Sequence, residues 1–223
     1  FDTNMLCIIT TACIHLRLPC AEELYESGAP STASFFDGGA SNLAAVASTT
    51  PTLLSPMAWL VVVSSISEHA MRSISRISNY PQSAFHEAYA KTYDEISTAL
   101  CDWESLLPKH MKYSEANLNH GIQAWYAGTF VSMHTLQQFV LMRLNHQKQQ
   151  DSVPDLASRN TRTARYHAHH LLEIMCALQS ARRDVDHPRP GQPVRFSFST
   201  PFAGYAILLA IEILSTSGPA ITP

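Results

Sequence analysis

The sequence predicts an all-α fold, an irregular multi-helix bundle of about five main helices preceded by an extended N-terminal segment. Three observations predict it. Long stretches between residues 56 and 215 repeat apolar residues at steps of three and four, the period of an amphipathic helix. Prolines lie between these stretches or at their starts, where a helix tolerates them. No alternation of apolar and polar residues is long enough to require a sheet.

Residues 1–55 are expected to form an extended, loop-rich N-terminal segment of the same domain, and residues 56–223 to form the helical domain. The pair Leu18-Pro19 ends an extended piece, a short helical turn follows, and Gly28 with Pro30 ends that turn. Residues 31–50 are rich in Ser, Thr, Ala and Gly, which predicts a loop.

The first two helices have clear signals at both ends. Ser55 is placed to cap a helix whose first position is Pro56, and this helix should run to about residue 78. The second should open at residue 82 or 83 and end near residue 106, before Pro108. One of its faces is apolar and aromatic and carries Phe85, Tyr89, Ile96, Leu100 and Trp103.

A third helix is predicted over residues 117–147. Its stretch from Trp125 to Asn145 contains no proline and has apolar residues on several faces, which predicts burial on most sides. It also carries polar groups inside this apolar stretch, at His134, Gln137 and Gln138, where a purely structural core would prefer Leu and Ala. This helix is therefore expected to be the central helix of the domain, with a role in packing and not in catalysis.

Residues 151–158 are predicted to form a loop, and residues 158–183 the fourth helix. A proline-rich stretch at 187–200 must be non-helical. The fifth helix should begin at residue 200 or 201, continue to about 215 and end before Gly218-Pro219. Its apolar residues lie most of the way around, which predicts a central position.

Composition excludes some classes of function. The 223 residues are 46% apolar and only 15% charged, with a net charge of −3, so the Lys/Arg surplus of a non-specific nucleic-acid binder is missing. The longest apolar run is far shorter than a membrane span of roughly 20 residues. Because the chain begins at Phe1 and has little charge, we expect it to be part of a longer protein.

The motif search favours no catalytic centre. Nucleophile-elbow and phosphate-loop patterns are absent from the sequence, so we expect no enzyme, no catalytic residue and no cofactor. Three cysteines near the N-terminus lack the close pairs of a zinc site. The exception is a metal hypothesis: His167, His170 and Glu173 recur at steps of three on one predicted helix and could form a ligand set.

Four short segments of the chain, taken in order, match a recurring pattern. They are LRLPCAEELYESGAP (residues 16–30), LPKHMKYSEANL (107–118), MHTLQQFVLMRLNH (133–146) and PFAGYAILLAIEILSTSG (201–218). In content and order they resemble the middle homology region, the regulatory domain, of fungal zinc-cluster transcription factors. The second segment matches through Trp103, Leu107 and Pro108, and the third through Met133, His134, Leu136, Leu144 and Asn145. The resemblance spans almost the whole chain.

The resemblance implies an all-helical regulatory domain that acts in the nucleus on genes transcribed by RNA polymerase II. In some members of that family the domain senses a small-molecule effector or restrains an activation segment, and the resemblance implies the transcription machinery as a partner. The six-cysteine zinc cluster and the heptad segment of the family are absent here. Zinc and specific DNA contact are therefore expected only through an N-terminal domain missing from this chain, which corresponds to the C-terminal portion of the regulatory region.

The candidate effector site lies where polar groups interrupt the aromatic and Met-rich third helix, at Trp125, Tyr126, Phe130, Met133, His134 and Gln137. Two alternatives stay open. One is an all-helical metal-dependent enzyme that uses the His167/His170/Glu173 cluster. The other is a structural dimerisation domain, which the low charge and the apolar first and fifth helices favour, so a homodimer is among the expected partners. No membrane partner is expected.

Overall fold

A computed structural model of the chain describes residues 16–28, 30, 33, 35–36, 43, 46, 54–146, 154–185 and 201–216. Within these residues the fold is all-α, as the sequence predicts. The elements in chain order are β1 (Leu16–Arg17), α1 (Glu22–Glu26), β2 (Phe35–Phe36), α3 (Pro56–Ile77), α4 (Gln82–Leu106), η3 (Lys109–Met111), α5 (Glu115–Gln123), α6 (Ala127–Asn145), α7 (Pro154–Val185) and α8 (Pro201–Thr216).

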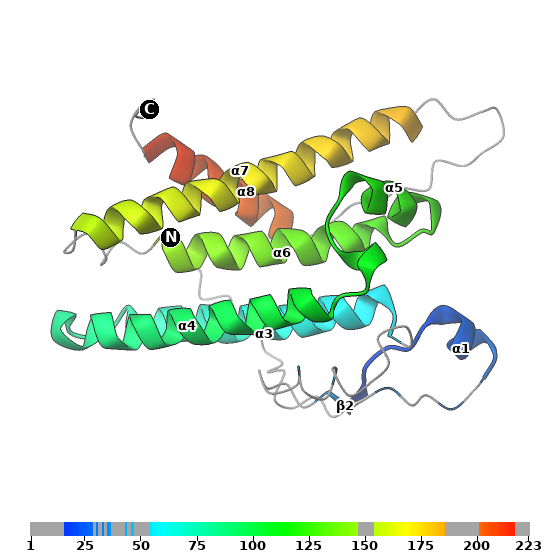
Figure 1. Ribbon diagram of the computed structural model, residues 1–223, viewed down its shortest axis with the longest axis horizontal. Helices are drawn as coiled ribbons and strands as arrows, with labels where there is room; N and C mark the ends of the chain where they lie inside the picture. Colours follow the sequence, from blue (N-terminus) through cyan, green and yellow to red (C-terminus); the bar gives the residue numbers. More distant parts are fainter. Residues whose placement is uncertain are drawn as a thin grey trace.

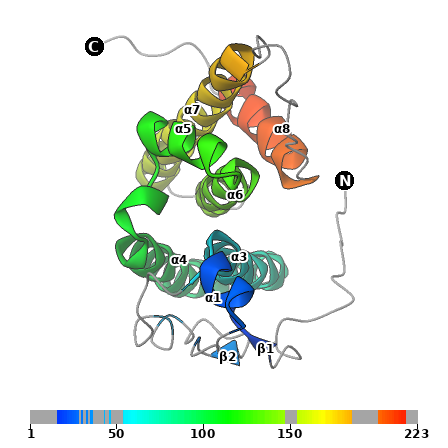
Figure 2. The same ribbon diagram turned by 90° about the vertical axis from the view of Figure 1, so that its right-hand side faces the viewer.

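The helices form two layers with α6 between them (Figure 1). Helices α3 and α4 lie side by side below α6, while α7 and α8 cross above it (Figure 2). The N-terminal elements lie beneath α3, where β1 pairs with β2 in antiparallel register and Cys20 forms an isolated bridge with Leu54. Only the short turn α1 and the extended residues before it were expected there; the two-residue strands are an addition.

Helix ends follow local capping chemistry. Ser55 Oγ accepts a hydrogen bond from the Ala58 amide at 3.3 Å, with Pro56 at the first position of α3. Ser114 caps α5 in the same way through the Asn117 amide at 3.1 Å. The predicted boundaries of α3, α4 and α8 are confirmed to within one or two residues. The proline-rich stretch at 187–200 lies outside the described residues.

Two predicted boundaries are wrong. The continuous helix expected over residues 117–147 is two helices, because the chain turns at Ala124–Tyr126 and Trp125 takes a positive φ of 67°. A non-glycine residue in that left-handed region cannot continue a helix. The loop expected at 151–158 is also shorter, since α7 already begins at Pro154, and proline is well tolerated in the first turn of a helix.

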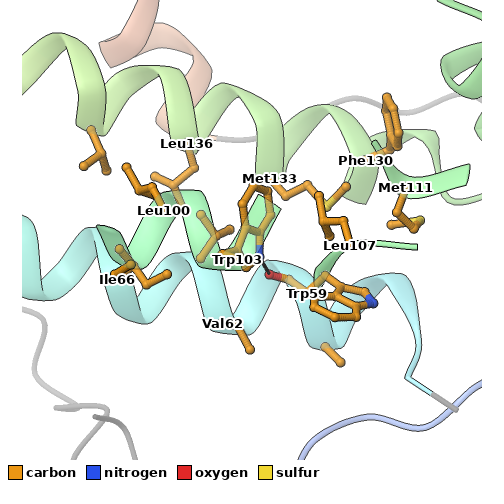
Figure 3. Packing of buried hydrophobic residues seen from close by; sticks show 14 of the residues in the cluster. Trp59, Val62, Ile66, Leu100, Trp103, Leu107, Met111, Phe130, Met133 and Leu136 are labelled. Carbon is orange, nitrogen blue, oxygen red and sulfur yellow. Dashed lines mark hydrogen bonds between the residues drawn. The ribbon is translucent and has the colours of Figure 1, made fainter. Parts of the chain in front are cut away.

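The main core joins α3, α4 and α6 (Figure 3). Its largest buried side chains are Trp59 and Trp103, and the Trp103 indole Nε1 donates a hydrogen bond to the carbonyl oxygen of Trp59 at 3.2 Å. This bond satisfies a polar group that would be costly to bury alone. Around the two indoles pack Val62, Ile66, Leu100, Leu107, Met111, Phe130, Met133 and Leu136.

A second core joins α6, α7 and α8. Half of its buried residues are alanines, which allow close approach of the helix backbones, and the others are Met142, Leu171, Leu209 and Ile213. Because α8 packs only one face into this core, it lies at the edge of its layer (Figure 2), and the expectation of a central fifth helix is wrong. None of the described helices combines the length and the apolar character that crossing a membrane requires.

The break between α5 and α6 generates a stability prediction. Trp125→Gly should raise the free energy of unfolding by up to about 1 kcal/mol, because glycine adopts a positive φ without the steric cost that tryptophan bears. Equilibrium urea unfolding measures the change. The matched control is Ala124→Gly, whose φ of −93° needs no glycine, and it should destabilise by roughly 0.5–1 kcal/mol. An equal loss from both substitutions would contradict strain at Trp125.

Candidate functional site

Helix α6 is buried on nearly every side, and polar side chains are among its buried residues. His134, Thr135, Gln137 and Gln138 are each less than a tenth exposed. Buried amide and imidazole groups need hydrogen-bond partners, since leaving one unpaired costs about 1–3 kcal/mol. His134, Gln137 and Gln138 have such partners on other elements, whereas the Thr135 hydroxyl has none among the described residues.

His134 faces the connection between α4 and α5. Its Nε2 donates to the carbonyl oxygen of Met111 at 2.9 Å, because a carbonyl can only accept. Three aromatic rings enclose the imidazole edge-on, those of Trp103, Tyr113 and Phe130, with ring centroids 6.0, 5.6 and 4.7 Å away. Burial lowers the pKa of His134 to about 4, so the ring is neutral at physiological pH.

The next two polar residues reach different helices. Gln137 Nε2 donates to the carboxylate Oε2 of Glu104 on α4 at 3.0 Å. Gln138 Oε1 accepts from Nδ1 of His167 on α7 at 2.8 Å. The pKa of His167 is also lowered to about 4, mainly by burial and to a smaller extent by the nearby His170. Consecutive side chains of α6 thus hold the helices on its two opposite sides.

A further clamp lies at the C-terminal end of α6. The hydroxyl of Tyr89 on α4 donates to the carbonyl oxygen of Leu144 at 2.9 Å. The side-chain amide of Asn160 on α7 donates in turn to the Tyr89 hydroxyl at 3.4 Å. This chain of contacts satisfies a carbonyl in the last turn of α6, where intrahelical partners run out.

The structure brings together four of the six residues predicted to line an effector site. Phe130, Met133, His134 and Gln137 all lie on α6 and are buried. The other two lie at the start of the helix. Trp125 is 64% exposed, and the ring of Tyr126 packs against Gly121 and edge-on to His120 at 5.9 Å.

Sequence reasoning did not select the groups that bind these polar side chains. They are the Met111 carbonyl, Tyr113 and Glu104, while His167 was considered only as a metal ligand and not as the partner of Gln138. A backbone carbonyl leaves no signal in a sequence. Gln138 stands out in the sequence as a polar group within the apolar stretch, although it was not placed among the residues of the effector site.

The three residues of the metal hypothesis lie on α7, but their side chains have different neighbours. His167 turns to Gln138, whereas His170 Nδ1 lies 3.2 Å from Glu173 Oε2 and its ring packs edge-on to Tyr113 at 5.2 Å. Across the part of the chain that the structure describes, no three His, Cys, Asp or Glu side chains gather where they could hold a metal ion. Within these residues the structure therefore gives no support to a metal site at His167, His170 and Glu173.

Comparisons with models of protein families, with curated proteins and with solved structures found no match to this chain.

The two buried histidines predict a stability that depends on pH. Above pH 6.5 both histidines are neutral in the folded and unfolded states. Between pH 6.5 and about pH 4 they are protonated in the unfolded chain but remain neutral in the folded protein. The free energy of unfolding should therefore fall as the pH drops from 6.5 toward 4, by on the order of 3 kcal/mol per histidine.

Urea unfolding at a series of pH values measures this loss. The informative variant is His167→Gln, whose amide can still donate to Gln138 but cannot titrate. It should show a shallower fall than the natural protein over the same pH range. An unchanged slope would mean that His167 binds protons equally in both states.

Proposed function

We propose that this chain is the regulatory domain of a fungal-type nuclear transcription factor that controls genes transcribed by RNA polymerase II. The proposal rests on the order of four short segments that resemble the middle homology region of that family. Binding to DNA and placement in the nucleus belong, in this proposal, to the whole protein and not to this chain alone.

One observation supports the proposal: residues of the second and third of the four resembling segments contact each other. Trp103, from the second segment's motif, packs edge-on to His134, from the third, and His134 bonds the Met111 carbonyl within the second. Asn117 ties the same segment together, since its side-chain amide donates to the carbonyls of Lys109 and Lys112 at 2.9 and 2.7 Å. These contacts are consistent with the second and third segments acting as one structural unit.

Of the two regulatory modes, restraint of an activation segment is the better supported. The polar groups of His134 and Gln137 are engaged by protein partners and not aimed at open space. Such bonds hold the α4–α5 connection and α4 itself against α6. A domain of this kind regulates when a partner or effector shifts the population between a held and a released arrangement.

Reporter transcription in yeast tests the proposal. The chain is placed between a heterologous DNA-binding domain and an activation segment, and compared with a flexible linker of equal length. The intact chain should lower transcription by roughly five-fold or more, the lower end of ordinary allosteric coupling. Trp103→Ala should restore transcription at equal protein abundance, because it removes the buried indole on α4 that packs against His134 of α6.

Trp125→Ala is the matched control, since that tryptophan is mostly exposed and its truncation should leave the restraint in place. Transcription that is the same with the intact chain as with the linker would refute a restraining domain. Restoration by both tryptophan variants would show that the effect is not specific to the core contact.

A further inference from the structure

Helix α8 turns an apolar face to solvent. Four large side chains on it, Phe202, Tyr205, Leu208 and Ile211, are 41%, 48%, 65% and 53% exposed. They recur at steps of three, while the alanines and Ile213 between them pack into the second core. Gly204 lies among them with nothing within 4 Å of the position that a Cβ would take, so the backbone is bare there.

The charges of α8 are as informative as its apolar residues. Glu212 is its only ionisable carboxylate, and the helix has no Lys or Arg. One carboxylate oxygen of Glu212 lies 3.6 Å from Nε2 of His146 in the same chain, and its side chain remains 52% exposed. The first turn carries no acidic residue and the last turn no basic one, so α8 itself supplies no charge that compensates its dipole at either end. At 100° per residue, Glu212 shares the exposed face with Tyr205 and Leu208.

We propose that this face of α8 binds the same face of a second copy of the chain, with the two α8 helices antiparallel. In the register centred between residues 206 and 207, Tyr205 of one copy lies opposite Leu208 of the other. The same register places Glu212 opposite Pro201, at the N-terminal end of the partner's helix. Phe202 and Ile211 flank these pairs and extend the apolar contact.

Charge selects this arrangement. Each Glu212 carboxylate meets the positive end of the partner's helix dipole, which supplies the acidic group that the first turn of α8 lacks. The two carboxylates are then about 16 Å apart along the axes at 1.5 Å per residue, beyond the screening length of about 8 Å in physiological salt. A parallel pair would place them side by side, where they repel.

Charge also argues against other occupants. An anionic lipid surface or a nucleic acid is recognised through Lys and Arg, which α8 does not contain. A face that is apolar apart from one carboxylate, and that complements itself when reversed, fits a two-fold symmetric contact between identical chains. This inference does not depend on the proposed regulatory function.

The exposed area sets the expected strength. Aromatic side chains bury roughly 150–250 Å² each when fully covered, so four large apolar side chains that are about half exposed offer on the order of 400 Å² per copy. A standard stable interface buries about 800 Å² per partner. We therefore expect a weak dimer that forms with a dissociation constant on the order of 100 μM.

Analytical ultracentrifugation over a range of concentrations tests the contact. The natural chain should shift from monomer to dimer, and Leu208→Glu should weaken the dimer at least ten-fold by placing a charge at its centre. Met57→Glu on α3 is the matched control, because Met57 is exposed to the same 48% as Tyr205 but lies on another helix. Circular dichroism checks that each variant keeps its helix content, and Tyr205→Glu provides a second variant.

Cysteine cross-linking tests the register. In a background with the five native cysteines replaced by serine, Tyr205→Cys and Leu208→Cys chains are oxidised separately and as a mixture. The mixture should form disulfide-linked dimers faster than either chain alone, because residue 205 faces residue 208 across the antiparallel pair.

Two results would overturn the inference. One is a natural chain that stays monomeric up to about 1 mM, well above the expected dissociation constant. The other is a dimer that Met57→Glu weakens as much as Leu208→Glu, which would place the contact elsewhere. Failure of the reporter experiment would leave both of these readouts unaffected.

Discussion

The burial of α6 is the constraint on which the rest of the structure depends. Because this helix has neighbours on nearly every side, three of its buried polar side chains bond to other elements, whereas Ser132 and Asn145 bond carbonyls of α6 itself. His134 takes a carbonyl of η3, Gln137 a carboxylate of α4, and Gln138 an imidazole of α7. Apolar contacts alone would tolerate sliding between helices, whereas these bonds specify one register.

The same constraint governs protonation and the outer helices. A histidine that is held neutral by burial acts as a hydrogen-bond donor of fixed tautomer, and His134 and His167 both serve in this way. The side of α6 away from the tryptophan core is covered by alanine-rich faces of α7 and α8. Only one face of α8 is used for this contact, which leaves its opposite apolar face uncovered.

Much of the fold is predictable because its signals are local. Ser55-Pro56 and the prolines at 81 and 108 mark the ends of α3 and α4 within a few residues. The turn at Trp125 was missed because no sequence rule places tryptophan at a positive φ. The position of α8 was missed because apolar residues all around a helix do not distinguish a buried helix from one with an uncovered face. Of the candidate site, side chains on α6 were predictable, but their partners came from elements whose packing only the tertiary structure defines.

The most direct test of the central claim is a double-mutant cycle between Gln138 and His167, measured by urea unfolding at neutral pH. If hydrogen bonds from α6 specify the register of its neighbours, the two alanine substitutions should be coupled by about 1 kcal/mol. Losses that add to within about 0.3 kcal/mol would contradict the account, because they would mean that the two side chains stabilise the fold independently.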